Sequence, residues 1–102
     1  MASFQHRFGS VLGRHSVGSD GFAAELIGEQ AAALGRAGRA VEAALAALRE
    51  GDPADREALL KAAASAVWAF FVQREACGFR DQKGVIAHYE IPRAVLVRLG
   101  AR

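Results

Sequence analysis

The feature that most constrains this chain is a seven-residue repeat of large apolar residues in its first half. The repeat consists of Ile27, Leu34, Val41 and Leu48. A spacing of seven places these side chains on one face of an α-helix, as in a coiled coil. The repeat therefore predicts a long helix over about residues 20–50, with this face buried against another helix.

Three glycines lie inside this predicted helix, where glycine is unfavourable. Gly28, Gly35 and Gly38 each cost about 1 kcal/mol relative to alanine in a helix interior. Two arrangements would explain them. Either a neighbour packs closely against the helix backbone at these positions, or the helix kinks near residues 35–38.

A second long helix is predicted over about residues 53–77. Gly51 ends the first helix, Asp52 can accept hydrogen bonds from the free amides of the next one, and Pro53 suits a first helical position. Gly78 can end the second helix in the left-handed conformation that glycine adopts without strain. Because the connection is tight, the two long helices are expected to be antiparallel.

The second half of this helix carries large apolar side chains around more than half of its circumference. Trp68, Phe70, Phe71 and Val72 supply most of them. The remaining arc holds small residues, namely Ala62, Ala66, Ala69 and Ala76. A helix without a strongly polar face is expected to be buried on nearly all sides, at the centre of the domain or under a second chain.

Two short helices are predicted after the second long one, over about residues 82–90 and 92–99. Asp81 can cap the first, and Pro92 can begin the second. The fold class is therefore all-α and bundle-like, with two long antiparallel helices followed by two short ones.

Composition and charge bound the domain organisation and the compartment. The chain has 102 residues, 52% of them hydrophobic, which suits one domain. We expect a helical domain over residues 20–102 and a basic, partly ordered arm over residues 1–19, where two arginines stand without any acid. One cysteine allows no internal disulfide, and no run of about 18 apolar residues predicts a membrane span, so a cytoplasmic protein is expected.

A cluster of polar residues ends the second long helix and enters the turn after it. The candidate polar cluster comprises Gln73, Arg74, Glu75, Cys77, Arg80 and Asp81. Arg74 and Glu75 fall within the apolar arc, so each charge has to be paired or reach water at the helix end. The cluster is either a network that pins the helix to the turn or a small functional site.

No catalytic, cofactor-binding or metal-binding constellation accompanies this cluster. The three histidines lack the spacing of metal ligands. Cys77 lies at a helix C-terminus, where the helix dipole opposes a thiolate. We therefore expect a protein that is not an enzyme and carries no cofactor.

Association with protein through helix packing is the favoured function. The repeat and the aromatic helix offer more apolar surface than one small bundle readily hides, so a homodimer, or a complex with another helical protein, is expected. The candidate self-association face comprises Ile27, Leu34, Val41, Leu48, Leu60, Val67 and Phe71.

A DNA-binding regulator is the alternative function. Residues 81–99 resemble a degenerate helix-turn-helix whose phosphate contacts would be Lys83, Arg93 and Arg98. Glu90, however, stands where the turn of such a motif usually carries glycine.

The segment from Trp68 to Gly100 also resembles a family of short, uncharacterised bacterial proteins. An aromatic helix runs into QREACGFRD, which fits the pattern QRE-x-CG-x-RD, and IPRAVL follows near the end. The resemblance implies a small all-helical protein from a domain family of unknown function, and it supplies no activity. Its most distinctive segment matches Gln73, Arg74, Glu75, Cys77, Gly78, Arg80 and Asp81.

Overall fold

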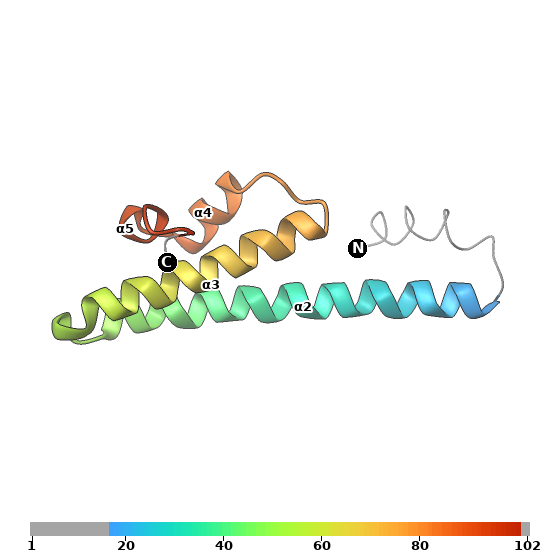
Figure 1. The fold of residues 1–102 in the computed structure, drawn as a ribbon, viewed down its shortest axis with the longest axis horizontal. Helices are drawn as coiled ribbons and strands as arrows, with labels where there is room; N and C mark the ends of the chain where they lie inside the picture. The colour runs from blue at the N-terminus through green and yellow to red at the C-terminus, as the bar shows by residue number, and fades with distance from the viewer. Residues whose placement is uncertain (1–16, 101–102) are drawn as a thin grey trace. The chain divides into compact units, whose positions relative to one another are not determined.

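The computed structural model describes residues 17–100, and within this range the chain is all-helical. The elements are α2 (Val17–Glu50), η1 (Pro53–Asp55), α3 (Arg56–Ala76), α4 (Lys83–Tyr89) and α5 (Arg93–Leu96) (Figure 1). No strand occurs in the described part, so the predicted all-α, bundle-like class is confirmed. The chain divides into two compact units, Met1–Ala33 and Leu34–Arg102.

The arm predicted over residues 1–19 falls largely outside the described range. Its residues 1–16 are not described, and its last residues, from Val17 on, already belong to α2. The first long helix therefore begins a few residues before the predicted position 20. In the first unit, Ala23 and Ile27 are buried, whereas Phe22 and Leu26 are exposed.

Helix α2 is continuous through its glycines, so the kink considered for residues 35–38 is absent. The other explanation holds at Gly38, which is buried. A Cβ atom placed there would lie 3.0 Å from the Tyr89 hydroxyl oxygen and 3.5 Å from the Phe70 ring. Glycine at this position lets two aromatic side chains pack directly against the helix backbone.

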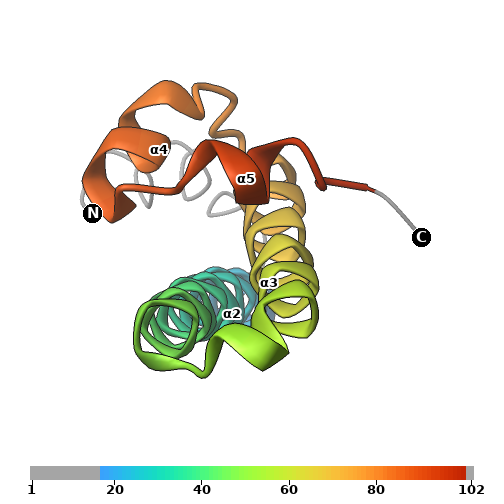
Figure 2. The ribbon, with the colours of Figure 1, turned by 90° about the vertical axis from the view of Figure 1, so that its left-hand side faces the viewer.

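Within the second unit, α3 runs back along the C-terminal half of α2 (Figure 1), and the end view shows the two helices side by side (Figure 2). Gly38 faces Phe70, and Gly51 faces Leu59, so positions later in α2 face positions earlier in α3. This is the predicted antiparallel pairing. The core that the helices share is built from Val41, Leu45, Leu48, Leu60, Ala63, Ala64, Val67, Phe70, Val85, Ile91 and Val95.

The connection between the long helices follows the predicted capping with one correction. The Asp52 carboxylate accepts a hydrogen bond from the Ala54 amide at 2.9 Å. Pro53 begins a single 3-10 turn rather than the α-helix, and α3 starts at Arg56 instead of residue 53. At the other end α3 stops at Ala76, one residue early, and Gly78 adopts the expected left-handed conformation with φ of 93°.

Within the single chain, helix α3 is buried on one side only, so the expectation that it lies at the centre of the domain was wrong, and cover by a second chain stays a prediction. Trp68 is 46% exposed and Val72 is 50% exposed. The arc of small residues also faces solvent for most of its length. We call this surface the open face of α3; it comprises Ala58, Ala62, Ser65, Ala69, Val72 and Ala76, all exposed.

The two short helices are shorter than predicted. Helix α4 spans Lys83–Tyr89 rather than 82–90, and α5 spans only Arg93–Leu96 rather than 92–99. Beyond α5 the chain continues as a turn with backbone hydrogen bonds three residues apart, such as the one from the Leu99 amide to the Leu96 carbonyl. Glu90 joins the helices in the left-handed conformation, with φ of 53°.

Candidate functional site

Arg74 is the centre of the polar cluster that the sequence indicates. Its Nε donates a hydrogen bond to Gln82 Oε1 at 3.0 Å, and its Nη2 donates to the Asp81 backbone carbonyl at 2.9 Å. The guanidinium carbon lies 5.9 Å from the centre of the Phe70 ring and 5.4 Å from that of Phe79. The side chain thus ties the end of α3 to the residues that lead into α4, with a cation–π contact on two rings.

The other members of the cluster divide into two groups. Gln73 Nε2 lies 3.8 Å from Sγ of the buried Cys77, and the Asp81 carboxylate accepts a hydrogen bond from the Lys83 amide at 3.0 Å. The side chains of Glu75 and Arg80 are exposed, and neither makes a hydrogen bond or ion pair with any described residue. The structure therefore brings Arg74 and Asp81 together and leaves Glu75 and Arg80 apart.

This geometry favours the pinning network over a reactive site. The Arg74 guanidinium is occupied by two acceptors and two rings, so it offers little to an anionic ligand. The only cysteine is buried beside an amide. Sequence patterns did not reveal Phe70, Phe79 and Gln82 as partners of Arg74, because the reversal at Gly78 brings the last two back across the helix end.

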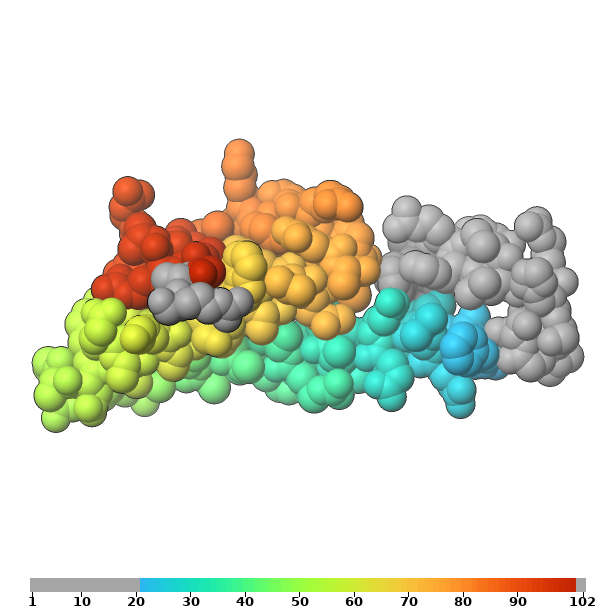
Figure 3. Space-filling view, in the orientation of Figure 1, coloured from blue at the N-terminus to red at the C-terminus, as the bar shows by residue number. Residues whose placement is uncertain are grey.

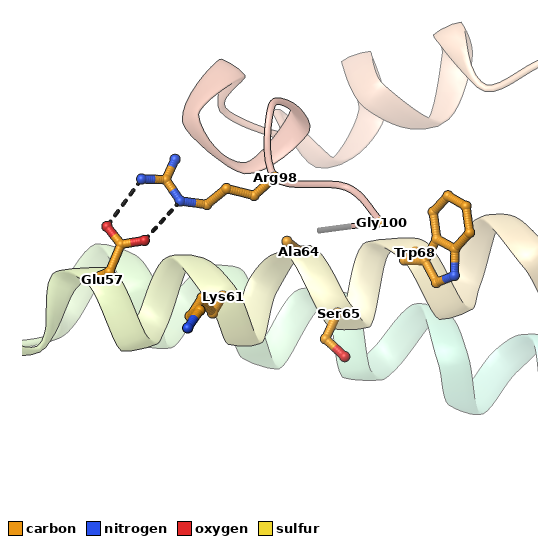
Figure 4. A pocket seen from close by; sticks show the side chains of 7 residues that line it. All are labelled: Glu57, Lys61, Ala64, Ser65, Trp68, Arg98 and Gly100. Carbon is orange, nitrogen blue, oxygen red and sulfur yellow. Dashed lines mark hydrogen bonds and ion pairs between the residues drawn. The ribbon is translucent and has the colours of Figure 1, made fainter. Parts of the chain in front are cut away.

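A second polar site joins α3 to the end of the chain. Arg98 and Glu57 form a bidentate ion pair, with Nη2–Oε1 at 3.0 Å and Nε–Oε2 at 3.1 Å, and Arg98 Nη1 also donates to the Ala94 carbonyl at 2.6 Å (Figure 4). The hydrogen bond from Arg98 and then its charge lower the pKa of Glu57 below its ordinary value of 4.5. The same hydrogen bond raises the pKa of Arg98.

This ion pair involves one of the three residues predicted to contact DNA phosphates. Arg98 is held by Glu57, whereas Lys83 and Arg93 are exposed. Helix α5 has four residues, little more than one turn, and a recognition helix has to reach several bases along the major groove. In this segment Ile91 and Val95 are buried in the core, and DNA binding stays a prediction.

A shallow groove of about 400 Å³ lies between α3 and the residues after α5 (Figure 4). It is lined by Glu57, Lys61, Ala64, Ser65, Trp68, Arg98 and Gly100. Its two opposite charges, Glu57 and Arg98, neutralise each other, so the groove carries one free cation, Lys61, among its lining residues. It borders the open face of α3 through Lys61, Ser65 and Trp68.

The residues predicted to form a self-association face do not lie on the open face of α3. Val41, Leu48, Leu60 and Val67 belong to the chain's own core, and Leu34 and Phe71 pack against that core. Ile27, in the first unit, is also buried. The apolar surface that α3 leaves uncovered is the open face instead. Part of α3, in yellow, is visible at the surface between α2 and the C-terminal elements (Figure 3).

The described residues lack two kinds of feature. Residues 17–100 contain no group of three or more His, Cys, Asp or Glu side chains placed to hold a metal ion. None of the helices in the same range combines the length and the apolar character that crossing a membrane requires.

Residues 17–100 thus form a small all-α fold in which Arg74 and Arg98 join α3 to the C-terminal elements. The chain belongs to DUF6665, a family of unknown function, whose model matches residues 10–102. The match extends the family resemblance of residues 68–100 over most of the sequence. No curated protein and no solved structure matches the chain significantly.

Proposed function

We propose that this chain is a small cytoplasmic, non-enzymatic protein of bacterial origin that acts through helix packing and associates with itself. The observation that carries the proposal is the open face of α3. A helix of 21 residues presents a continuous line of apolar and small side chains to solvent, together with a half-exposed tryptophan. Exposed apolar surface that runs along one element is characteristic of a protein–protein contact.

The two polar sites support a structural rather than a chemical role. Arg74 and Arg98 satisfy backbone carbonyls and side chains of the same chain, and each links α3 to the C-terminal elements. Such links hold α3 in place while its opposite side stays open. The protein therefore presents a rigid helix face, which lowers the entropy lost when a partner binds.

The solution mass tests this proposal. Multi-angle light scattering should be recorded on the full chain over a wide range of concentrations. We expect a species of about twice the 10.8 kDa chain mass that dissociates on dilution. A mass of 10.8 kDa at every concentration would contradict self-association.

A further inference from the structure

The open face of α3 has the spacing of a helix-pairing seam. Its six positions are separated alternately by four and three residues from Ala58 to Ala76, which is the a/d pattern of a heptad. Four of the six residues are alanine, one is serine and one is valine. Small side chains let two helix axes come within about 8 Å, the short end of the usual range. All six side chains are exposed in the single chain.

We propose that the occupant of this face is α3 of a second copy, paired antiparallel about a two-fold axis near Trp68. This inference rests on the proposed self-association and specifies its interface. The register is the one in which every seam residue faces another seam residue. Ala58 then faces Ala76 of the second copy, Ala62 faces Val72, and Ser65 faces Ala69. A two-fold contact uses the same patch on both copies, and this seam is complementary to itself.

The charges beside the seam select the antiparallel direction. Lys61 lies seven residues before Trp68 and Glu75 lies seven residues after it, so all three occupy the same flanking position of the heptad. The register of the six seam positions is centred at the level of residue 67, and there Lys61 of each copy lies beside Glu75 of the other on the same flank, two residues out of level. In a parallel pair, each charge would lie level with its own counterpart. Glu75 is free for this role, since the described residues give it no partner.

Trp68 completes the contact at the axis. The same register places the two Trp68 side chains next to each other across the axis, two residues out of level, and each is 46% exposed in the single chain. One side of the indole already packs near Gly100, where a Cβ would lie 3.8 Å from the ring. A buried aromatic side chain contributes strongly to an interface, and tryptophan is enriched at interface centres.

Charge reversal in two variants tests this arrangement. Lys61→Glu places two Glu–Glu pairs across its own homodimer, and Glu75→Lys places two Lys–Lys pairs across its own. Each homodimer should dissociate about tenfold more readily than the wild type, since two attractive contacts become repulsive. An equimolar mixture should recover dimer, because each copy then meets opposite charge at both ends. The double variant K61E/E75K should also dimerise alone.

Matched controls separate the seam from general charge effects. Lys83→Glu reverses an exposed charge on α4 and should leave the dimer intact. Ala69→Glu places a charge inside the seam and should yield monomer, whereas Ala87→Glu alters an exposed alanine of α4 without effect on mass. Circular dichroism of every variant verifies that the helices are retained.

The outcomes distinguish this inference from the proposal on which it rests. A wild-type dimer that responds as described supports both. A wild-type dimer that tolerates both single reversals and Ala69→Glu overturns the α3 pairing and leaves self-association standing. A wild-type monomer overturns both and indicates that any partner of the open face is not a second copy of this chain.

Discussion

At the scale of single residues, Glu90 occupies a conformation that its side chain disfavours. It adopts φ of 53° and ψ of 51° between α4 and α5, and it is the only non-glycine residue with positive φ in the described chain. A left-handed conformation costs a residue with a Cβ atom about 1–2 kcal/mol relative to glycine. Replacing Glu90 by glycine would remove this cost, but glycine also has more conformational freedom in the unfolded chain, and that freedom offsets about half of the stability gained.

Glu90→Gly should therefore raise the free energy of unfolding by up to about 1 kcal/mol. Chemical denaturation followed by circular dichroism measures this change. Ala87→Gly is the matched control, because Ala87 lies in α4, where glycine should destabilise by about 1 kcal/mol. Equal destabilisation by both changes would show that Glu90 is not strained.

The Glu57–Arg98 ion pair makes stability depend on pH. The pKa of Glu57 is lowered in the folded protein, so the pair stabilises the fold above pH 4.5, the ordinary value, and this contribution is lost as the pH falls through the lowered pKa. Glu57→Gln should lower the melting temperature at pH 7 by a small amount, since the Glu57 side chain is exposed and Arg98 is partly exposed, so water screens the pair. The difference from the wild type should shrink as the pH falls below 4.5 and through the lowered pKa of Glu57.

Thermal melts at several pH values, with Glu42→Gln as an exposed control on α2, measure this effect. The control should show no such convergence with the wild type. A gap for Glu57→Gln that stays constant as the pH falls well below 4.5 would argue against the ion pair.

At the scale of elements, Arg74 is expected to hold the junction of α3 and α4. Arg74→Met keeps most of the apolar stem on Phe70 and Phe79 but removes the hydrogen bonds to Gln82 and to the Asp81 carbonyl. Hydrogen bonds from a charged donor contribute about 1.5–3 kcal/mol, so we expect a loss of that order in the free energy of unfolding. Urea denaturation measures the loss.

Arg80→Met is the matched control for this change, because Arg80 is exposed and should tolerate substitution within about 0.5 kcal/mol. Hydrogen exchange should show faster opening of α4 in Arg74→Met than in Arg80→Met. If the two variants were equally stable, the network would not be a structural pin, and a functional role for Arg74 would gain support.

The sequence predicts where the helices begin and end better than it predicts which residues cover or contact them. Local signals predicted the end of the first long helix at Gly51, a cap at Asp52 and a left-handed turn at Gly78. The structure has each of these features at the predicted residue. Helical periodicity also shows that Ala62 and Ala69 share a face. It cannot show whether a neighbour covers that face, because this depends on where the short C-terminal helices pack. The exposure of α3 and the partners of Arg74 are consequences of that tertiary arrangement.

At the scale of the whole molecule, the second unit contains a complete core of its own. Every member of the core cluster lies between Val41 and Val95. A fragment comprising residues 34–102 should therefore fold and unfold cooperatively, as judged by circular dichroism during thermal denaturation. Val41→Asp in the same fragment should abolish the transition, because it buries an unpaired charge at a fully buried position. A fragment without a cooperative transition would show that residues before Leu34 are needed for this core.

The half-exposed position of Trp68 also gives the protein a built-in optical probe. Trp68 is the only tryptophan in the chain, and it stands beside the open face of α3. Its emission wavelength and its quenching by iodide therefore report on one patch of the surface, without a label and without interference from any other indole. A ligand, a second copy or a change at Gly100 that covers or uncovers that patch can be followed directly by intrinsic fluorescence.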